Sequence, residues 1–166
     1  MPLCRFLRPA HAAGLAGAPQ ALQSASRLKR AVYTIGYGGR RPEDFVSLLK
    51  QFGIEQVVDV RAFPTSKYEG FKREELEKFL PQHGISYLWM EELGGYRRGG
   101  YEAYTREKKF REGLGRLEGI AREKPTVIMC LEGYPSGCHR RFISRELARR
   151  GWRVLHIVGK GRILEE

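Results

Sequence analysis

The residues of this chain that could do chemistry gather in one short segment, residues 130–141. An apolar run, 127–129, precedes it and an amphipathic run, 142–150, follows it, which predicts a strand, a glycine- and proline-bearing turn and a helix. Backbone N–H groups at a helix N-terminus lack intrahelical partners and favour negative charge. The segment therefore predicts an anion site. The side chains that carry this prediction are a thiol, an imidazole and two guanidinium groups: Cys138, His139, Arg140 and Arg141.

Cys138 has two interpretations. In the first turn of a helix and beside cations, its pKa should be lowered, and the thiolate is the reactive form of cysteine. Cys138 is then a candidate catalytic nucleophile or redox thiol, with His139 and Arg140 as candidate ligand-binding residues. In the second interpretation Cys138 is a small buried side chain, and the polar residues after it only open the helix.

Cys130 ends the predicted strand and favours a place in the core, because free cysteine packs as a small apolar group. If the following loop folds back, Cys130 could approach Cys138 and form a reversible disulfide. A zinc site of recognised type needs four ligands at tight spacing, and these two cysteines with His139 do not form such a set. We therefore expect neither a metal nor a cofactor.

Three further charged residues are candidates for acid, base or ligand-binding roles. Asp59 and Arg61 alternate around Val60, so their side chains should point to the same side of a strand. They form an ion pair, act on a ligand, or do both; on a ligand, Asp59 would be an acid or base and Arg61 would hold an oxyanion. Glu132 is the other candidate acid or base; alternatively it pairs with Arg61 or Arg140.

A glycine-bearing turn, Gly36-Tyr37-Gly38-Gly39, follows the first apolar run. Turns of this kind before helices present backbone amides to phosphate, so Gly36, Tyr37 and Gly38 are candidate ligand-binding residues. The turn is not the dinucleotide-binding fingerprint, because the third glycine and the later ribose-binding acid are absent from their places.

Alternating strands and helices position these residues. Such alternation implies parallel crossovers, hence a single three-layer α/β domain, residues 31–166, with a mainly parallel five-stranded sheet and helices on both faces. Ligand sites in such sheets form beyond the carboxyl ends of the strands, where the candidate residues fall. The expected strands cover 32–35, 56–60, 85–89, 127–129 and 153–158. The expected helices cover 42–52, 76–80, 110–121 and 142–150, and 94–101 is expected to be a loop.

Composition limits the class of protein. The chain has 166 residues, a formal net charge of +11 and three cysteines. Residues 1–30 hold five basic residues and no acid, which predicts a disordered or removable leader: a targeting segment, or a start read too early. Few cysteines indicate a reducing, cytoplasmic setting rather than a disulfide framework. No apolar run is long enough to cross a membrane, so no membrane partner is expected.

Four motifs in order resemble the family called domain of unknown function 488. The resemblance runs from about Val32 to Gly159 and implies a compact α/β domain without implying a particular activity. It adds Ser66 to the candidate ligand-binding residues, and the chain has Tyr37 where a histidine is common. The motifs are Tyr33-Thr34-Ile35-Gly36-Tyr37, Val58-Asp59-Val60-Arg61 with Pro64 and Ser66, Leu93-Gly94-Gly95, and Cys130-x-Glu132 followed by Cys138-His139-Arg140.

Two functions from different classes follow. The first is a small enzyme with an anion-binding site at the carboxyl-end rim, acting on a phosphorylated or nucleotide-like ligand. The alternative is a nucleic-acid-binding module that uses an arginine-rich loop and a basic helix face. Charged helix faces are often only solvated, and Glu146 interrupts this one. The residues of the alternative are Arg97, Arg98, Arg141, Arg145 and Arg149.

Overall fold

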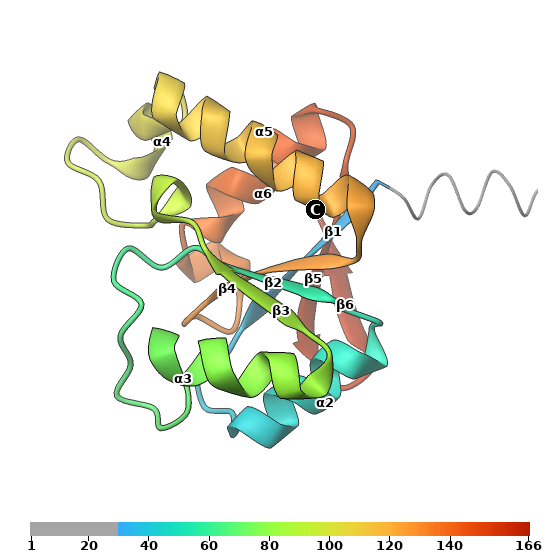
Figure 1. The fold of residues 1–166 in the computed structure, drawn as a ribbon. Helices are drawn as coiled ribbons and strands as arrows, with labels where there is room; N and C mark the ends of the chain where they lie inside the picture. The colour runs from blue at the N-terminus through green and yellow to red at the C-terminus, as the bar shows by residue number, and fades with distance from the viewer. Residues whose placement is uncertain (1–29) are drawn as a thin grey trace, which may run out of the picture.

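The computed structural model describes residues 30–166, which form one six-stranded sheet between two layers of helices (Figure 1). The strand order is β3-β2-β4-β1-β5-β6. Strands β1 to β5 pair in parallel, and β6 pairs antiparallel with β5. The predicted leader lies outside the described residues except for Arg30. The strands are β1 (Ala31–Gly36), β2 (Gln56–Asp59), β3 (Ser86–Trp89), β4 (Thr126–Cys130), β5 (Arg153–Gly159) and β6 (Arg162–Glu165).

The helices cover the sheet on both faces, α2 and α3 on one and α4, α5 and α6 on the other (Figure 1). Their bounds are α2 (Pro42–Gln51), α3 (Arg73–Phe79), α4 (Tyr101–Tyr104), α5 (Lys108–Glu123) and α6 (Arg140–Arg149). Three short 3-10 helices complete the set: η1 (Leu80–His83), η2 (Glu91–Leu93) and η3 (Pro135–Gly137). None of the helices in this described part of the chain is long and apolar enough to cross a membrane.

The alternation of side chains along each strand produces two separate cores. Val58 of β2 packs with Leu114 and Ile143 on the side of α5 and α6. Its neighbour Val57 packs with Phe45 on the side of α2 and α3. Successive residues of a strand point to opposite faces, and here both faces are buried, which explains the uninterrupted apolar runs of the central strands.

The expected α/β class, the parallel sheet and the helices on both faces are confirmed, with two additions. A sixth strand, β6, extends the sheet at the edge; its four residues are exposed, so it lacked the apolar run that marks a buried strand. A one-turn helix, α4, begins at the last residue of the segment 94–101 expected to be a loop, and no helix is expected there. Its tyrosines at 101 and 104 are buried, a spacing too short to show helical periodicity in the sequence.

A close approach at Gly36 joins the ends of β1 and β4. Beyond the strands, the N–H groups of Tyr37 and Gly38 donate to the carbonyl oxygens of Cys130 and Leu131, at 3.0 and 2.9 Å. A Cβ added to Gly36 would lie 1.9 Å from the carbonyl oxygen of Glu132. Only glycine therefore lets the segment after β4 pass this close to β1.

Replacing Gly36 by alanine tests this packing. We expect Gly36→Ala to lower the free energy of unfolding by about 1–3 kcal/mol, because the new methyl group meets backbone that cannot rotate away. Gly115, exposed on α5 with nothing within 4 Å of an added Cβ, is the matched control, and Gly115→Ala should raise stability by about 0.5–1 kcal/mol. Urea denaturation followed by circular dichroism measures both changes. Equal stability of Gly36→Ala and the parent chain would contradict the prediction.

Candidate functional site

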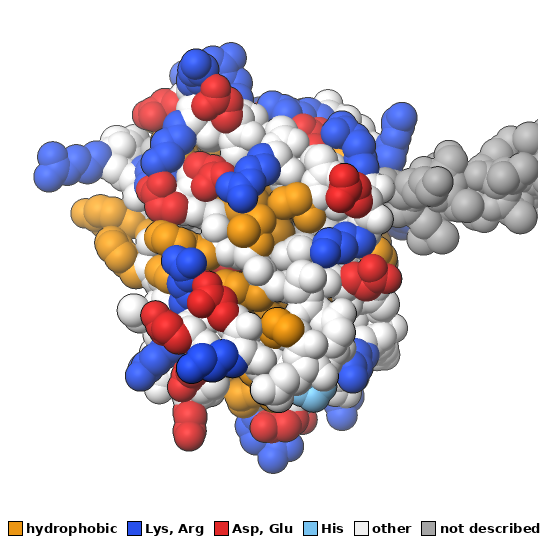
Figure 2. Space-filling model, in the orientation of Figure 1, with side chains coloured by type: hydrophobic (Ala, Val, Ile, Leu, Met, Phe, Trp, Pro, Cys, Tyr) orange, Lys and Arg blue, Asp and Glu red, His pale blue; other side chains and the backbone are white. Residues whose placement is uncertain are grey.

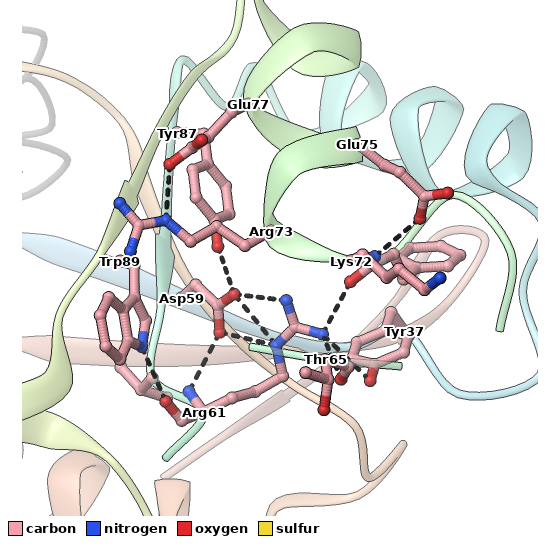
Figure 3. A network of polar contacts seen from close by, with 12 residues as sticks. Tyr37, Asp59, Arg61, Thr65, Lys72, Arg73, Glu75, Glu77, Tyr87 and Trp89 are labelled. Atoms are coloured by element: carbon pink, nitrogen blue, oxygen red, sulfur yellow. Dashed lines mark hydrogen bonds and ion pairs between the residues drawn. The ribbon is translucent and has the colours of Figure 1, made fainter. Parts of the chain in front are cut away.

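An ion pair between Asp59 and Arg61 lies buried at the carboxyl end of β2 (Figure 3). Arg61 Nη2 and Asp59 Oδ2 are 2.5 Å apart, and Arg61 Nε is 2.9 Å from Asp59 Oδ1. Arg61 is 5% exposed and Asp59 is 0% exposed. One of the two interpretations of this pair, the ion pair, is thus present in the structure.

The remaining donors of Arg61 point at protein acceptors. Its Nη1 donates to the carbonyl oxygen of Phe71 at 2.8 Å and to the carbonyl of Thr65 and the hydroxyl of Tyr37, both at 3.2 Å. On the other side, the Tyr87 hydroxyl donates to Asp59 Oδ2 at 2.5 Å. Burial, and next the charge of Asp59, raise the pKa of Tyr87, so this phenol stays protonated. This geometry favours a positioning role for Arg61 over direct contact with a ligand.

A second cluster, the thiol–imidazole cluster, consists of Cys130, Cys138 and His139 on the opposite face of the sheet. His139 Nδ1 is 3.5 Å from Cys138 Sγ and 4.0 Å from Cys130 Sγ. His139 Nε2 is 2.7 Å from the carbonyl oxygen of Val60. A carbonyl only accepts, so Nε2 carries a proton, and Nδ1 faces the two sulfurs.

Cys138 lies just outside helix α6 rather than in its first turn, which corrects the expectation from the sequence. It is extended after η3, His139 is the N-cap and the helix begins at Arg140. The Arg140 backbone N–H nevertheless points at Cys138 Sγ, 3.5 Å away. The Cys130 thiol, then His139 and this N–H, lower the pKa of Cys138 against the effect of burial. The hydrogen bond with Cys138, and next burial, raise the pKa of Cys130. The pair therefore favours one shared thiolate.

Arg140 points into the domain, away from the rim, and is 0% exposed. Its Nη1 donates to Thr34 Oγ1 at 3.0 Å and its Nη2 donates to the carbonyl oxygen of Glu132. Thr34 Oγ1 is in turn 2.8 Å from His156 Nδ1 on the neighbouring strand. Burial lowers the pKa of His156, so its ring favours the neutral form. Among residues 30–166 Arg140 forms no ion pair, and its Nε has no hydrogen-bond partner.

The other candidate residues take three different places. Tyr37 and Ser66 line one cavity of about 290 Å³, beside the Asp59–Arg61 pair. The N–H of Gly38 is bonded to the protein backbone, so this turn does not present it to a phosphate. The Glu132 side chain is exposed, and only its backbone oxygen meets Arg140. The cavity is lined by Tyr37, Thr65, Ser66, Lys67, Tyr68 and Leu131.

The two clusters meet at Val60. Its carbonyl oxygen binds His139 on one face, while the residues before and after it form the ion pair on the other. Sequence reasoning missed two partners of the pair, Tyr87 and Trp89, whose indole Nε1 donates to the Arg61 carbonyl at 2.9 Å. The register of β3 beside β2 sets their place, with Asp59 opposite Trp89. Only the alternating aromatic residues of β3 hinted at them.

The Asp59–Arg61 pair yields a stability prediction. Asp59→Asn should lower the free energy of unfolding by about 3–5 kcal/mol, because it leaves a buried guanidinium without its counter-charge. Glu77→Gln, which breaks the exposed pair between Glu77 and Arg73, is the control and should change little. Urea denaturation curves of the three proteins measure the difference. An Asp59→Asn protein as stable as the control would show that the pair is not needed for the fold.

The comparisons with known proteins add one positive finding. The family model described as "Domain of unknown function DUF488" matches residues 41–147, from the start of α2 to near the end of α6, and so includes both clusters. No curated protein and no solved structure matches the chain. Since the family model spans more than half of the 166 residues, this chain belongs to the DUF488 family.

Proposed function

We propose that this protein is a small enzyme that binds a phosphate-bearing or similarly anionic ligand at the carboxyl-end rim of its sheet. The observation that carries the proposal is the cavity lined by Tyr37, Ser66 and Lys67, which brings two hydroxyl groups and an ammonium group together beyond the ends of β1 and β2. Rims of this kind are where open parallel sheets bind ligands.

The hydrogen bonds around this cavity leave its hydroxyl groups ready to donate. The Tyr37 oxygen accepts a hydrogen bond from Arg61 Nη1, and the Ser66 oxygen accepts one from the Tyr68 N–H at 3.0 Å. Each hydroxyl therefore keeps its own proton for another acceptor. Phosphate offers several acceptor oxygens, and the exposed Lys67 adds a positive charge. In this arrangement Arg61 acts through Tyr37, as a positioning residue.

The thiol–imidazole cluster supplies the reactive group of the proposed enzyme. It lies at the same rim, on the other face of the sheet. His139 contacts the Val60 carbonyl, and the next residue in the chain, Arg61, donates to the Tyr37 hydroxyl of the cavity. Glu132 places a carboxylate in solvent on the same rim, where it can serve as acid or base. Asp59, by contrast, is committed to Arg61 and Tyr87.

Binding of inorganic phosphate and of a panel of nucleotides, measured by titration calorimetry, tests the proposed ligand class. Ser66→Ala and Lys67→Ala should each weaken the affinity about tenfold, as expected for the loss of one hydrogen bond to a charged group. Lys50→Ala removes an exposed charge from the C-terminal turn of α2 and is the matched control. No heat of binding for any of these ligands, or equal affinity of all variants, would count against the proposal.

The nucleic-acid alternative gains one supporting observation. Phe63, Tyr96 and Tyr134 are 70%, 71% and 52% exposed on loops that follow β2, η2 and β4, where they could stack on unpaired bases. Charge gives less support: on the face that Figure 2 shows, basic and acidic side chains are interspersed. On the helix face itself, Arg149 is paired with Glu146.

A fluorescence-anisotropy titration with a single-stranded oligonucleotide tests this alternative. Nucleic-acid binding should weaken steeply with added salt, because phosphate contacts release counterions, and Tyr96→Ala should cost about 1–3 kcal/mol of binding free energy. His83→Ala, which removes an aromatic ring in η1 outside the three exposed loop residues, serves as the control. Absence of binding even at low salt would dismiss the alternative and leave the enzyme proposal untouched.

A further inference from the structure

We propose that Cys130, Cys138 and His139 bind one divalent transition-metal ion, with Zn²⁺ as the best match, through three protein ligands and a fourth position left for water or a ligand. The sulfur atoms of the two cysteines and a ring nitrogen of His139 all lie within 4.8 Å of one another. The inference concerns the cluster that the proposed function uses as its reactive group, and it would make these side chains metal ligands. Metal binding needs neither the cavity nor its anion, so the two proposals can fail separately.

The donor set selects the class of metal. Two thiolate sulfurs and one imidazole nitrogen suit borderline-soft ions such as Zn²⁺, whereas Mg²⁺ and Ca²⁺ prefer oxygen ligands. Three protein ligands with one open position are typical of catalytic zinc sites, while structural sites use four. The cluster found among residues 30–166 holds three ligands and no carboxylate.

The distances are close to those that a tetrahedral ion needs. Zn–S bonds of about 2.3 Å and Zn–N bonds of about 2.0 Å place two sulfurs about 3.8 Å apart and a sulfur and a nitrogen about 3.5 Å apart. The His139 Nδ1 atom is already 3.5 Å from Cys138 Sγ and 4.0 Å from Cys130 Sγ. The two sulfurs are at most 4.8 Å apart, so side-chain rotations that bring them closer by about 1 Å or less close the coordination sphere.

The surroundings hold His139 in the orientation that a metal ligand requires. Its Nε2–H donates to the Val60 carbonyl, the outer-shell bond that commonly fixes the tautomer of metal-binding histidines and leaves Nδ1 free to coordinate. Gly95 lies against the ring, since an added Cβ would be 2.4 Å from Nδ1. The Tyr101 ring packs on it as well, with centroids 5.0 Å apart.

The two simpler interpretations of the cluster explain less of this geometry. A disulfide between the cysteines would use both sulfurs and give no role to Nδ1, which faces them. If Cys130 and Cys138 were only core residues, nothing would require His139 to face them while bonded to the Val60 carbonyl. A metal ion uses all three groups at once, and the Arg140 backbone N–H directed at Cys138 Sγ then supports a bound thiolate.

Metal titration of the full chain, reduced and stripped with a chelator, tests the proposal. We expect one Zn²⁺ per chain by mass spectrometry, and Co²⁺ should give sulfur-to-metal charge-transfer absorption with the strong visible bands of a tetrahedral site. Cys130→Ser, Cys138→Ser and His139→Gln should each weaken binding at least tenfold. Two matched controls, Cys4→Ser and His83→Gln, should bind as the parent chain does. Sub-stoichiometric binding, or binding that the three variants leave unchanged, would overturn the proposal.

A second measurement covers variants that fail to fold. In the parent chain, bound Zn²⁺ should protect Cys130 and Cys138 from alkylation at least tenfold, with Cys4 as the internal reference, as read by peptide mass spectrometry. Equal alkylation with and without Zn²⁺ would overturn the proposal. Both measurements are made without phosphate, so a failed metal site and a failed anion site give separate results.

Discussion

The buried ion pair between Asp59 and Arg61 is the constraint around which the carboxyl-end rim is built. It joins β2 to the end of β1 through Tyr37, to the following loop through Phe71, and to β3 through Tyr87. Desolvating two charges opposes folding, and a buried pair often contributes little net stability. Its benefit here is positional, because the guanidinium of Arg61 and the carboxylate of Asp59 together hold four segments of the chain in fixed relation.

The same turn of chain organises both faces of the rim. Asp59 and Arg61 place their side chains on the side of α2 and α3. The Val60 carbonyl between them accepts a hydrogen bond from His139 on the side of α5 and α6. A shift of the ion pair would therefore move the acceptor that orients the imidazole. The cavity at Tyr37 and the thiol–imidazole cluster are thus positioned by three consecutive residues.

Much of this arrangement could be read from the sequence, because apolar runs and the residues that end them are local signals. These signals located strands β1 to β5 and helices α2, α3, α5 and α6. The direction of Arg140 could not be read in this way. Its neighbours predict only that it opens a helix, whereas the rotation of that helix against the sheet sends the side chain inward to Thr34. Strand β6 was missed because an exposed edge strand carries no apolar run.

The partnership of Cys130 with Cys138 depends on the loop between them, and buried Arg140 explains why that loop turns back. Arg140 Nη2 holds the Glu132 carbonyl, while the Gly38 N–H holds the Leu131 carbonyl from the other side. The absence of a side chain at Gly36 makes room for the loop between these two contacts. An arginine that the sequence suggests as an anion ligand thus serves the site indirectly: it fixes the loop that returns Cys138 to Cys130, and so assembles the cluster it does not join.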